Sequence, residues 1–148
     1  MQVQIRCAAK EDLPALKQFL LNAGLGTDGL GEETVDYFLM MEDEEGEVVG
    51  TVGMEKLAEN GLLRSLVVTS SQAQQDLLFL LQQAFQFARD KHITKLFLAT
   101  NKQSAIPFFQ LLGFQVVNRD CLSEELFASE HIQSILLVDN SVFLKYSF

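Results

Sequence analysis

The chain has 148 residues, a length that suits one domain with its own hydrophobic core. Hydrophobic residues make up 48% of it and charged residues 21%, a balance that excludes an intrinsically disordered chain. The net charge of −9 argues against nucleic acid as a partner, because binding to phosphates needs clustered lysine and arginine. The densest apolar run, residues 77–81, is too short to cross a membrane, so no membrane partner is expected. Residues 1–13 lack the apolar core of a signal peptide, which predicts a cytoplasmic protein.

Two cysteines, Cys7 and Cys121, are too few for a disulfide framework. Neither has a cysteine or histidine partner at the spacing of metal ligands, so no metal site is expected. Cys7 continues the alternation of Val3 and Ile5. We therefore expect it to be a small buried strand residue rather than a reactive thiol.

The N-terminal part of the chain predicts a strand followed by two helices. Polar and apolar residues alternate over 2–7, the period of a half-buried strand. Residues 10–23 carry apolar side chains at helical spacing, and Gly24 is placed to end this helix. After a glycine-rich connection, a second helix is expected over 32–41, with Val35, Phe38 and Leu39 on one face.

The middle of the chain predicts a hairpin and a long helix. Strands are expected over 47–56 and 62–68, joined at Glu59-Asn60-Gly61, because Asn-Gly is a strong hairpin signal. The acidic run 42–47 before them is expected to be a solvated turn, with weak attraction for a cationic amine as the alternative. The helix over 72–91 has an apolar stripe formed by Leu77, Leu81, Ala84 and Ala88, with Leu78 and Phe85.

The C-terminal part predicts a strand over 95–100 and a helix with Ser104 as N-cap and Pro107 in its first turn. Residues 114–118 and 142–148 are expected to be strands, and 123–131 a short helix. The helical crossover between strands 62–68 and 95–100 makes these two parallel. The sequence therefore predicts one α/β domain over 1–148, a three-layer α/β/α sandwich around a mixed, mostly antiparallel sheet.

Two segments resemble the GCN5-related N-acetyltransferases. The segment Ala105-x-x-Phe108-Phe109-x-x-x-Gly113-Phe114 matches the family's A-x-x-F-Y/F-x-x-x-G-F, and the opening Ile5-Arg6-x-Ala8 followed by Asp12-Leu13 is also typical. The order of elements agrees over nearly the whole chain. Gly61-Leu62-Leu63-Arg64-Ser65 is further similar to the small acetyltransferases encoded with arsenic-resistance genes. The resemblance implies the acyl-CoA N-acyltransferase fold.

The resemblance also implies a binding site for acetyl-CoA as co-substrate. In the family, the pantetheine arm pairs with the strand that corresponds to 62–68, here at Leu66, Val67 and Val68. The pyrophosphate lies at the N-terminus of the next helix, whose free N–H groups and dipole favour anions. That segment is here formed by Gln72, Ala73, Gln74, Gln75, Asp76 and Leu77. Asn101 matches a position that contacts the CoA arm, with an ordinary turn or cap as the alternative.

The phosphate-binding segment departs from the family's pattern, which reads Q or R, then x-x-G-x, then G or A. If Gln72 holds the first position, Gln75 and Leu77 replace the two small residues; a shift by one residue puts Asp76 and Leu78 there. Neither register restores a glycine. A carboxylate at Asp76 would also oppose a pyrophosphate, by about 1 kcal/mol in bulk water and roughly 4 at an effective dielectric of 20 for charges ~4 Å apart.

Phe109 is a second departure, because many family members have tyrosine there, whose hydroxyl protonates the leaving thiolate. Phenylalanine cannot donate a proton, so water or another group must act, or the step goes unassisted. Phe108 and Phe109 are expected to pack in the core and against the cofactor.

Three polar residues on the predicted hairpin are candidates for substrate chemistry. Glu55 lies where family members often place a base or an amine-binding carboxylate; a solvent-facing strand residue is the alternative. Arg64 and Ser65 lie in the middle of an apolar strand, where a guanidinium is costly unless it is paired. Arg64 therefore binds either a substrate carboxylate or a structural acid.

Two functions follow from these observations. The first is transfer of acetyl from acetyl-CoA to the primary amine of a small molecule by direct attack. The second is a non-catalytic binding or regulatory module that has kept the fold and lost acetyl-CoA, which the glycine-free segment supports. The sequence names neither the amine nor the oligomeric state, so a homodimer stays open.

Overall fold

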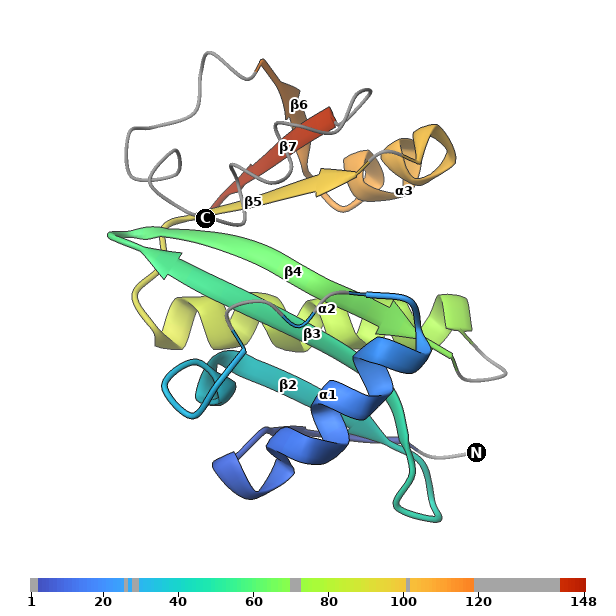
Figure 1. The fold of residues 1–148 in the computed structure, drawn as a ribbon. Helices are drawn as coiled ribbons and strands as arrows, with labels where there is room; N and C mark the ends of the chain where they lie inside the picture. The colour runs from blue at the N-terminus through green and yellow to red at the C-terminus, as the bar shows by residue number, and fades with distance from the viewer. Residues whose placement is uncertain (1–2, 26, 28–29, 70–72, 101, 119–141) are drawn as a thin grey trace. The chain divides into compact units, whose positions relative to one another are not determined.

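A computed structural model of the chain describes residues 3–25, 27, 30–69, 73–100, 102–118 and 142–148. Contacts divide the chain into two compact units. The first consists of Met1–Glu55 and Leu63–Phe87, and the second of Lys56–Leu62 and Ala88–Phe148. The strands are joined in the order β1-β2-β3-β4-β5-β7-β6 (Figure 1). The helix expected over 123–131 lies outside the described residues.

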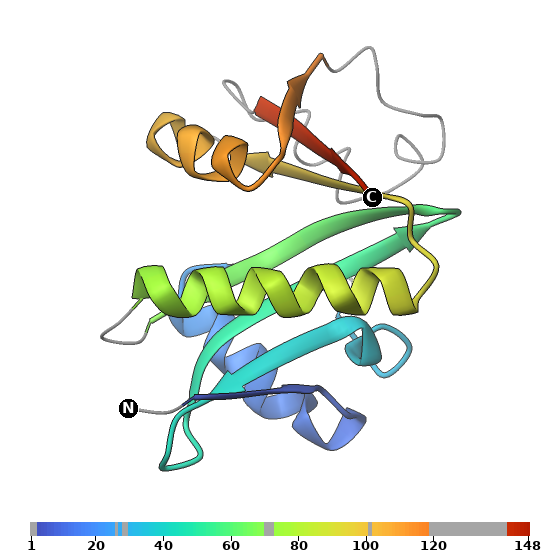
Figure 2. The same cartoon turned by 180° about the vertical axis from the view of Figure 1, so that it is seen from behind.

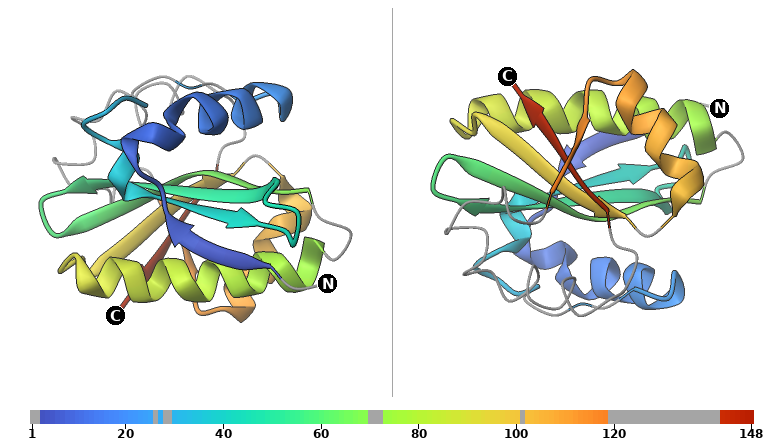
Figure 3. Two further views of the ribbon diagram at one scale, coloured as in Figure 1. Left: turned by 90° about the horizontal axis from the view of Figure 1, so that it is seen from below. Right: turned by 90° about the horizontal axis from the view of Figure 1, so that it is seen from above.

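The first unit is a sheet with a helix on each face. Its strands come from β1 (Gln4–Cys7), β2 (Phe38–Glu42), β3 (Val48–Leu57) and β4 (Asn60–Val68). β1 pairs antiparallel with β2, and β2 antiparallel with β3. Helix α1 (Leu13–Asn22) covers one face and α2 (Ala73–Asp90) the other, as Figures 2 and 3 show. The expected layers are therefore present in this unit.

The second unit contains the parallel pair that the sequence predicts. Here β4 pairs with β5 (Lys95–Thr100) in parallel, from Asn60 opposite Lys95 to Leu62 opposite Phe97. β7 (Val142–Ser147) lies antiparallel between β5 and β6 (Gln115–Val117). A 3-10 turn, η3 (Gln103–Ala105), leads into α3 (Ile106–Leu111). The mixed, mostly antiparallel sheet is confirmed.

The core of the first unit is built from alternating strand residues and one stripe of each helix. Leu16 and Leu20 of α1 are fully buried and pack with Phe38 and Met40 of β2. In the part of α2 that belongs to this unit, the buried stripe is formed by Leu80, Leu81 and Ala84. The predicted stripe was partly wrong: it omitted Leu80, and Leu78 is 37% exposed.

The helix predicted over 32–41 is wrong. A 3-10 turn, η2 (Val35–Tyr37), preceded by Thr34, leads directly into strand β2. The four residues Phe38 to Met41 are all buried, because the strand is covered on both faces. A strand of this kind has no polar alternation, so its apolar spacing resembled that of a helix.

Two local predictions are also wrong. The hairpin turn between β3 and β4 is formed by Ala58 and Glu59, not by Asn60-Gly61, and Ala58 has a φ of 58°. Gly61 is instead a packing position, since an added Cβ would lie 3.0 Å from Leu96 and 3.1 Å from Ile93. Ser104 is not the N-cap of α3: that position is Ala105, which makes no side-chain cap bond.

Cys7, expected to be buried, is exposed. Among the described strands, β1 is the first in the sheet order, so one of its edges has no neighbour within that set. Alternation predicts which residues share a face of such a strand but not whether anything covers it. The acidic run behaves as predicted, as an exposed turn: Asp43 Oδ1 accepts hydrogen bonds from the N–H groups of Glu45 and Glu47, at 2.9 and 3.0 Å.

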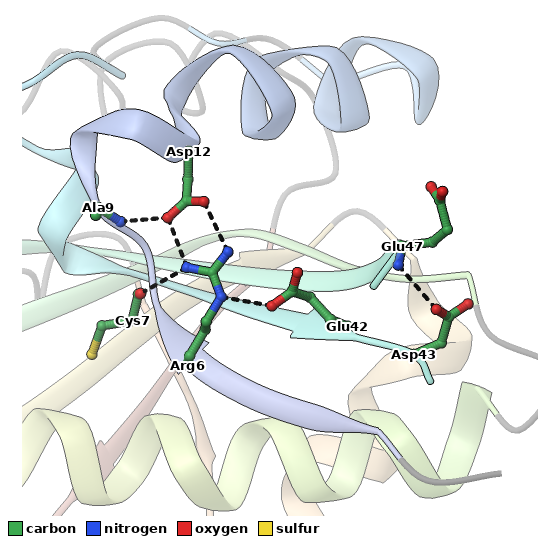
Figure 4. A network of polar contacts seen from close by, with 7 residues as sticks. All are labelled: Arg6, Cys7, Ala9, Asp12, Glu42, Asp43 and Glu47. Atoms are coloured by element: carbon green, nitrogen blue, oxygen red, sulfur yellow. Dashed lines mark hydrogen bonds and ion pairs between the residues drawn. The ribbon is translucent and has the colours of Figure 1, made fainter. Parts of the chain in front are cut away.

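An ion-pair network ties the N-terminal strand to its neighbours (Figure 4). The Arg6 guanidinium donates two hydrogen bonds to Asp12, at 2.7 and 2.8 Å, and one to Glu42, at 2.6 Å. Asp12 also accepts a bond from the Ala9 N–H, at 2.8 Å. The Arg6 bonds, with that of Ala9, lower the pKa of Asp12 to about 2. In the N-terminal segment that resembles the family, Arg6 and Asp12 therefore stabilise the fold.

Replacing Asp12 with asparagine is expected to lower the free energy of unfolding at pH 7 by about 1 kcal/mol, since the pair is partly exposed and screened by water. Because the pKa of Asp12 is depressed in the folded state, its stabilisation is complete above pH 4 or so and disappears as the pH falls through about 2. Urea unfolding at several pH values checks this. The difference between wild type and variant should shrink toward pH 2, and a difference that stays constant down to pH 2 would contradict the role of the Asp12 carboxylate.

Candidate active site

β4 has a backbone irregularity at its centre. Ser65 adopts a φ of 54°, in the left-handed region that residues with a Cβ rarely occupy. Such a conformation costs of order 1–3 kcal/mol and is found preferentially at active sites and ligand clamps. The Ser65 carbonyl accepts a hydrogen bond of 2.8 Å from the hydroxyl of Thr51 on β3. This irregularity could not be predicted, because serine is not a residue that marks positive φ.

Beyond Ser65, β4 lies against β3. The Thr69 N–H donates to the Val49 carbonyl at 2.8 Å. A Cβ added at Gly50 would lie 3.2 Å from the Val67 carbonyl oxygen. The Val67 side chain packs against the core of the first unit. The cofactor role predicted for Leu66, Val67 and Val68 stays a prediction.

Glu55 and Arg64 lie on one face of the β3–β4 hairpin. Leu57 of β3 packs against the hydrophobic cluster that contains Leu62 of β4. Since strand side chains alternate between faces, Glu55 shares the face of Leu57, and Arg64 shares the face of Leu62. Both charged residues are half-buried, and the Nε atom of Arg64 is fully buried. The hairpin thus brings a carboxylate and a guanidinium to the same surface as the irregular strand.

The first turn of α2 presents an exposed and an enclosed side. Ala73, Gln74 and Gln75 are exposed, whereas Asp76 is only 8% exposed and Leu77 is half-buried. Asp76 precedes Leu80, Ala84 and Ala88 at intervals of four residues, so it lies on the buried stripe of the helix. The exposed side of this turn therefore carries amide side chains rather than the carboxylate.

Phe108 and Phe109 belong to the second unit. Phe109 is buried and packs edge-on against Phe108, with ring centroids 5.5 Å apart, and against Phe114, at 5.8 Å. These contacts bear out the core-packing interpretation of Phe109, whereas Phe108 is half-buried and packs against its ring. Their predicted contact with a cofactor stays a prediction.

Two predicted site residues, Gln72 and Asn101, lie outside the described residues. All others except the two phenylalanines belong to the first unit. Within the part of the chain that the structure describes, no three His, Cys, Asp or Glu side chains are grouped so as to hold a metal ion. No helix in the same residues is both long and apolar enough to span a membrane.

Thr51 is the site residue that sequence reasoning missed. It is completely buried, in a run that reads Gly50-Thr51-Val52-Gly53. A polar residue inside such a run is the one available signal, because a buried hydroxyl needs a hydrogen-bond partner. Gly53 beside it has a packing role: a Cβ there would overlap the Phe38 ring.

The sequence matches the profile of a known family, and it is similar to a bacterial protein over nearly the full length of both chains. The profile of the acetyltransferase (GNAT) family matches residues 12–114. The uncharacterized protein YwlB of Bacillus subtilis (strain 168) is 32% identical over 146 residues, which cover 98% of this chain and 97% of YwlB.

Solved structures share the fold over the full chain. N-acetylglutamate synthase from Neisseria gonorrhoeae, complexed with coenzyme A and N-acetyl-glutamate, matches with a TM-score of 0.78 and 23% identity. That match covers 99% of this chain and 35% of the Neisseria protein, so the chain spans about a third of its length. Rv2747 from Mycobacterium tuberculosis, in complex with CoA, has a TM-score of 0.75, 21% identity and coverage of 98% and 99%. At such low identity these matches show the fold alone.

Proposed function

Because the chain belongs to the acetyltransferase (GNAT) family, we propose that it transfers the acetyl group of acetyl-CoA to the primary amine of a small molecule. The observation that carries this proposal is the strained Ser65 in β4, the strand that precedes a long helix with an exposed first turn. Such strain costs stability and is concentrated at active sites and ligand clamps, so it favours a functional role for this strand. We further propose that the whole chain, 1–148, serves as one catalytic domain.

Acetyl-CoA suits the residues present. The first N–H groups of α2 have no partner within the helix, and its dipole favours a pyrophosphate. The exposed side of the first turn carries neutral glutamine amides, and the carboxylate of Asp76 is buried. Without glycines, the backbone cannot approach phosphate oxygens as closely, so glutamine side chains would supply part of the contact. We propose that acetyl-CoA binds along residues 66–68 of β4 and at this turn.

The proposed reaction is direct attack of the neutral amine on the thioester carbonyl carbon. The C–N bond forms, negative charge develops on the carbonyl oxygen, and the backbone N–H of Leu66 stabilises it. Glu55 takes the proton that the amine loses. The C–S bond then breaks, and the thiolate of CoA leaves and takes a proton from water, since Phe109 has none to donate.

Arg64 indicates which chemical class of amine the protein would accept. It lies on the same hairpin face as Glu55, one residue before the irregularity, and the chain as a whole is acidic. A guanidinium forms paired hydrogen bonds to a carboxylate, whereas a carboxylate such as Glu55 suits an amine. We therefore propose an acceptor that carries both an amine and a carboxylate.

Thermal unfolding with and without acetyl-CoA tests the proposal. Saturation at ~100 times Kd stabilises the folded state by roughly 2.7 kcal/mol, which raises Tm by about 5–10 °C in a domain of this size. Acetyl-CoA should give a saturable shift of this order, followed by acetyl transfer in a screen of amines with and without a carboxylate. No shift with millimolar acetyl-CoA, CoA or a longer acyl-CoA would contradict it.

The other candidate is a non-catalytic module with the same fold. The glycine-free first turn, Ala73-Gln74-Gln75-Asp76, is the observation that favours it. In that case the thermal shift would be absent, while Ser65 would keep its strained conformation for a reason other than CoA. The two functions are thus separated by one binding measurement.

A further inference from the structure

Thr51 places a polar group in the interior of the first unit. Its side chain is 0% exposed, and it lies opposite Met40 of β2, a residue that is itself buried. Valine has nearly the same shape and would fill this position without a polar atom. A buried hydroxyl without a partner would cost about 1–3 kcal/mol, so its hydrogen bond to the Ser65 carbonyl, 2.8 Å long, is needed.

This bond fixes the direction of one peptide plane. The Ser65 carbonyl and the Leu66 N–H belong to the same peptide group, which is planar and, like all peptide bonds described, not cis. In a trans peptide the two groups point in opposite directions. Since the carbonyl points at β3, the Leu66 N–H points away from β3. The plane would otherwise be free to rotate toward the ordinary strand conformation, which relieves the strain at Ser65.

We propose that Thr51 is a positioning residue for acetyl transfer. Its hydroxyl holds the Ser65–Leu66 peptide so that the Leu66 N–H is aimed at the carbonyl oxygen of the thioester. The inference rests on the proposed function, because it assigns a task to the strand that would bind acetyl-CoA. Thr51 itself touches neither the co-substrate nor the amine.

A comparison of acetyl-CoA with CoA tests this, because only acetyl-CoA has the thioester carbonyl. Both ligands are titrated by calorimetry into wild type, Thr51→Val and Thr51→Ser. For Thr51→Val we expect acetyl-CoA to bind about 5- to 10-fold more weakly, the effect of one misplaced hydrogen bond, while CoA binds as to wild type. Thr51→Ser keeps the hydroxyl and should restore acetyl-CoA binding. With acetyl-CoA labelled at the carbonyl carbon, the infrared carbonyl stretch should move toward its solution value in Thr51→Val.

Thr94→Val is the matched control. Its hydroxyl also donates to a backbone carbonyl, that of Glu59, at 3.3 Å, but it lies in the second unit and is exposed. It should change neither ligand's affinity. If Thr51→Val does not fold, the substitution is combined with Ser65→Gly in a double variant, because glycine adopts the left-handed conformation without strain.

The outcomes separate the inference from the proposed function. Equal weakening of both ligands in Thr51→Val, or no weakening, would overturn the positioning role while leaving acetyl transfer intact. Selective loss of acetyl-CoA affinity that serine rescues would support it. If the wild type binds neither ligand, the proposed function fails, and the positioning role fails with it.

Discussion

Glu55→Gln is expected to lower the turnover number about 100- to 10,000-fold, the contribution typical of a positioned general base. Glutamine keeps the size and hydrogen-bonding capacity of the side chain but cannot accept the proton that the amine loses. Affinity for acetyl-CoA should stay close to that of wild type, because the co-substrate is proposed to bind along β4 and at α2. Initial rates of CoA release with the best amine from the screen measure the first effect, and calorimetry the second.

Glu59→Gln controls for the removal of one negative charge from the same hairpin. Glu59 is exposed and lies in the two-residue turn between β3 and β4. Its replacement should leave turnover unchanged. Glu55→Asp should retain part of the activity, because the base is kept but displaced by one methylene. Wild-type turnover in Glu55→Gln would remove Glu55 from the mechanism and leave proton transfer to water.

The sequence predicted the fold well where periodicity was clear. The strand at 95–100 was placed at its observed bounds, and the long helix within one residue at each end. Both elements have a pattern that fits only one kind of secondary structure. The strand is a short, mostly apolar run after a helix, and the helix has an apolar stripe that continues over five turns. The parallel pairing of β4 and β5 followed from the helical crossover between them.

Prediction failed where burial depends on neighbours distant in sequence. Phe38 to Met41 are buried on both faces of β2, which a local pattern cannot distinguish from a buried helix segment. At Asn60-Gly61 the local turn preference is overridden by packing, because Gly61 is needed beneath Ile93 and Leu96. Asn-Gly therefore lies inside a strand, and Ala58 takes the positive φ at the turn.

The family pattern directed the search to β4 and to the first turn of α2, whose cofactor roles stay predictions. That the hairpin brings Glu55 and Arg64 to one face was not predicted. The strain at Ser65 and its bond from Thr51 were not predictable, because both depend on the register between β3 and β4. The burial of Asp76 likewise depends on how α2 is rotated on the sheet, and the predicted apolar stripe was rotated away from Leu80.

Gln75→Glu is expected to change stability and ligand binding in opposite directions. Gln75 is exposed in the first turn of α2, where a negative charge interacts favourably with the helix dipole. The free protein should therefore become more stable by about 0.3–1 kcal/mol. The same carboxylate would lie near the proposed pyrophosphate site. Charges ~4 Å apart repel by about 1 kcal/mol in water and roughly 4 at an effective dielectric of 20, so CoA should bind at least ~5-fold more weakly.

Thermal unfolding without ligand and calorimetry with CoA measure the two effects, and Gln83→Glu supplies the control. Gln83 is exposed on the same helix, about two turns further along, so it carries the same change of charge away from the first turn. It should alter CoA binding little, and the loss in Gln75→Glu should shrink at high salt, which screens exposed charges. If Gln75→Glu raises stability while CoA binds as before, the pyrophosphate does not lie at this turn. The helix N-terminus would then be a structural feature, and the missing glycines would mark the loss of the phosphate site rather than its adaptation.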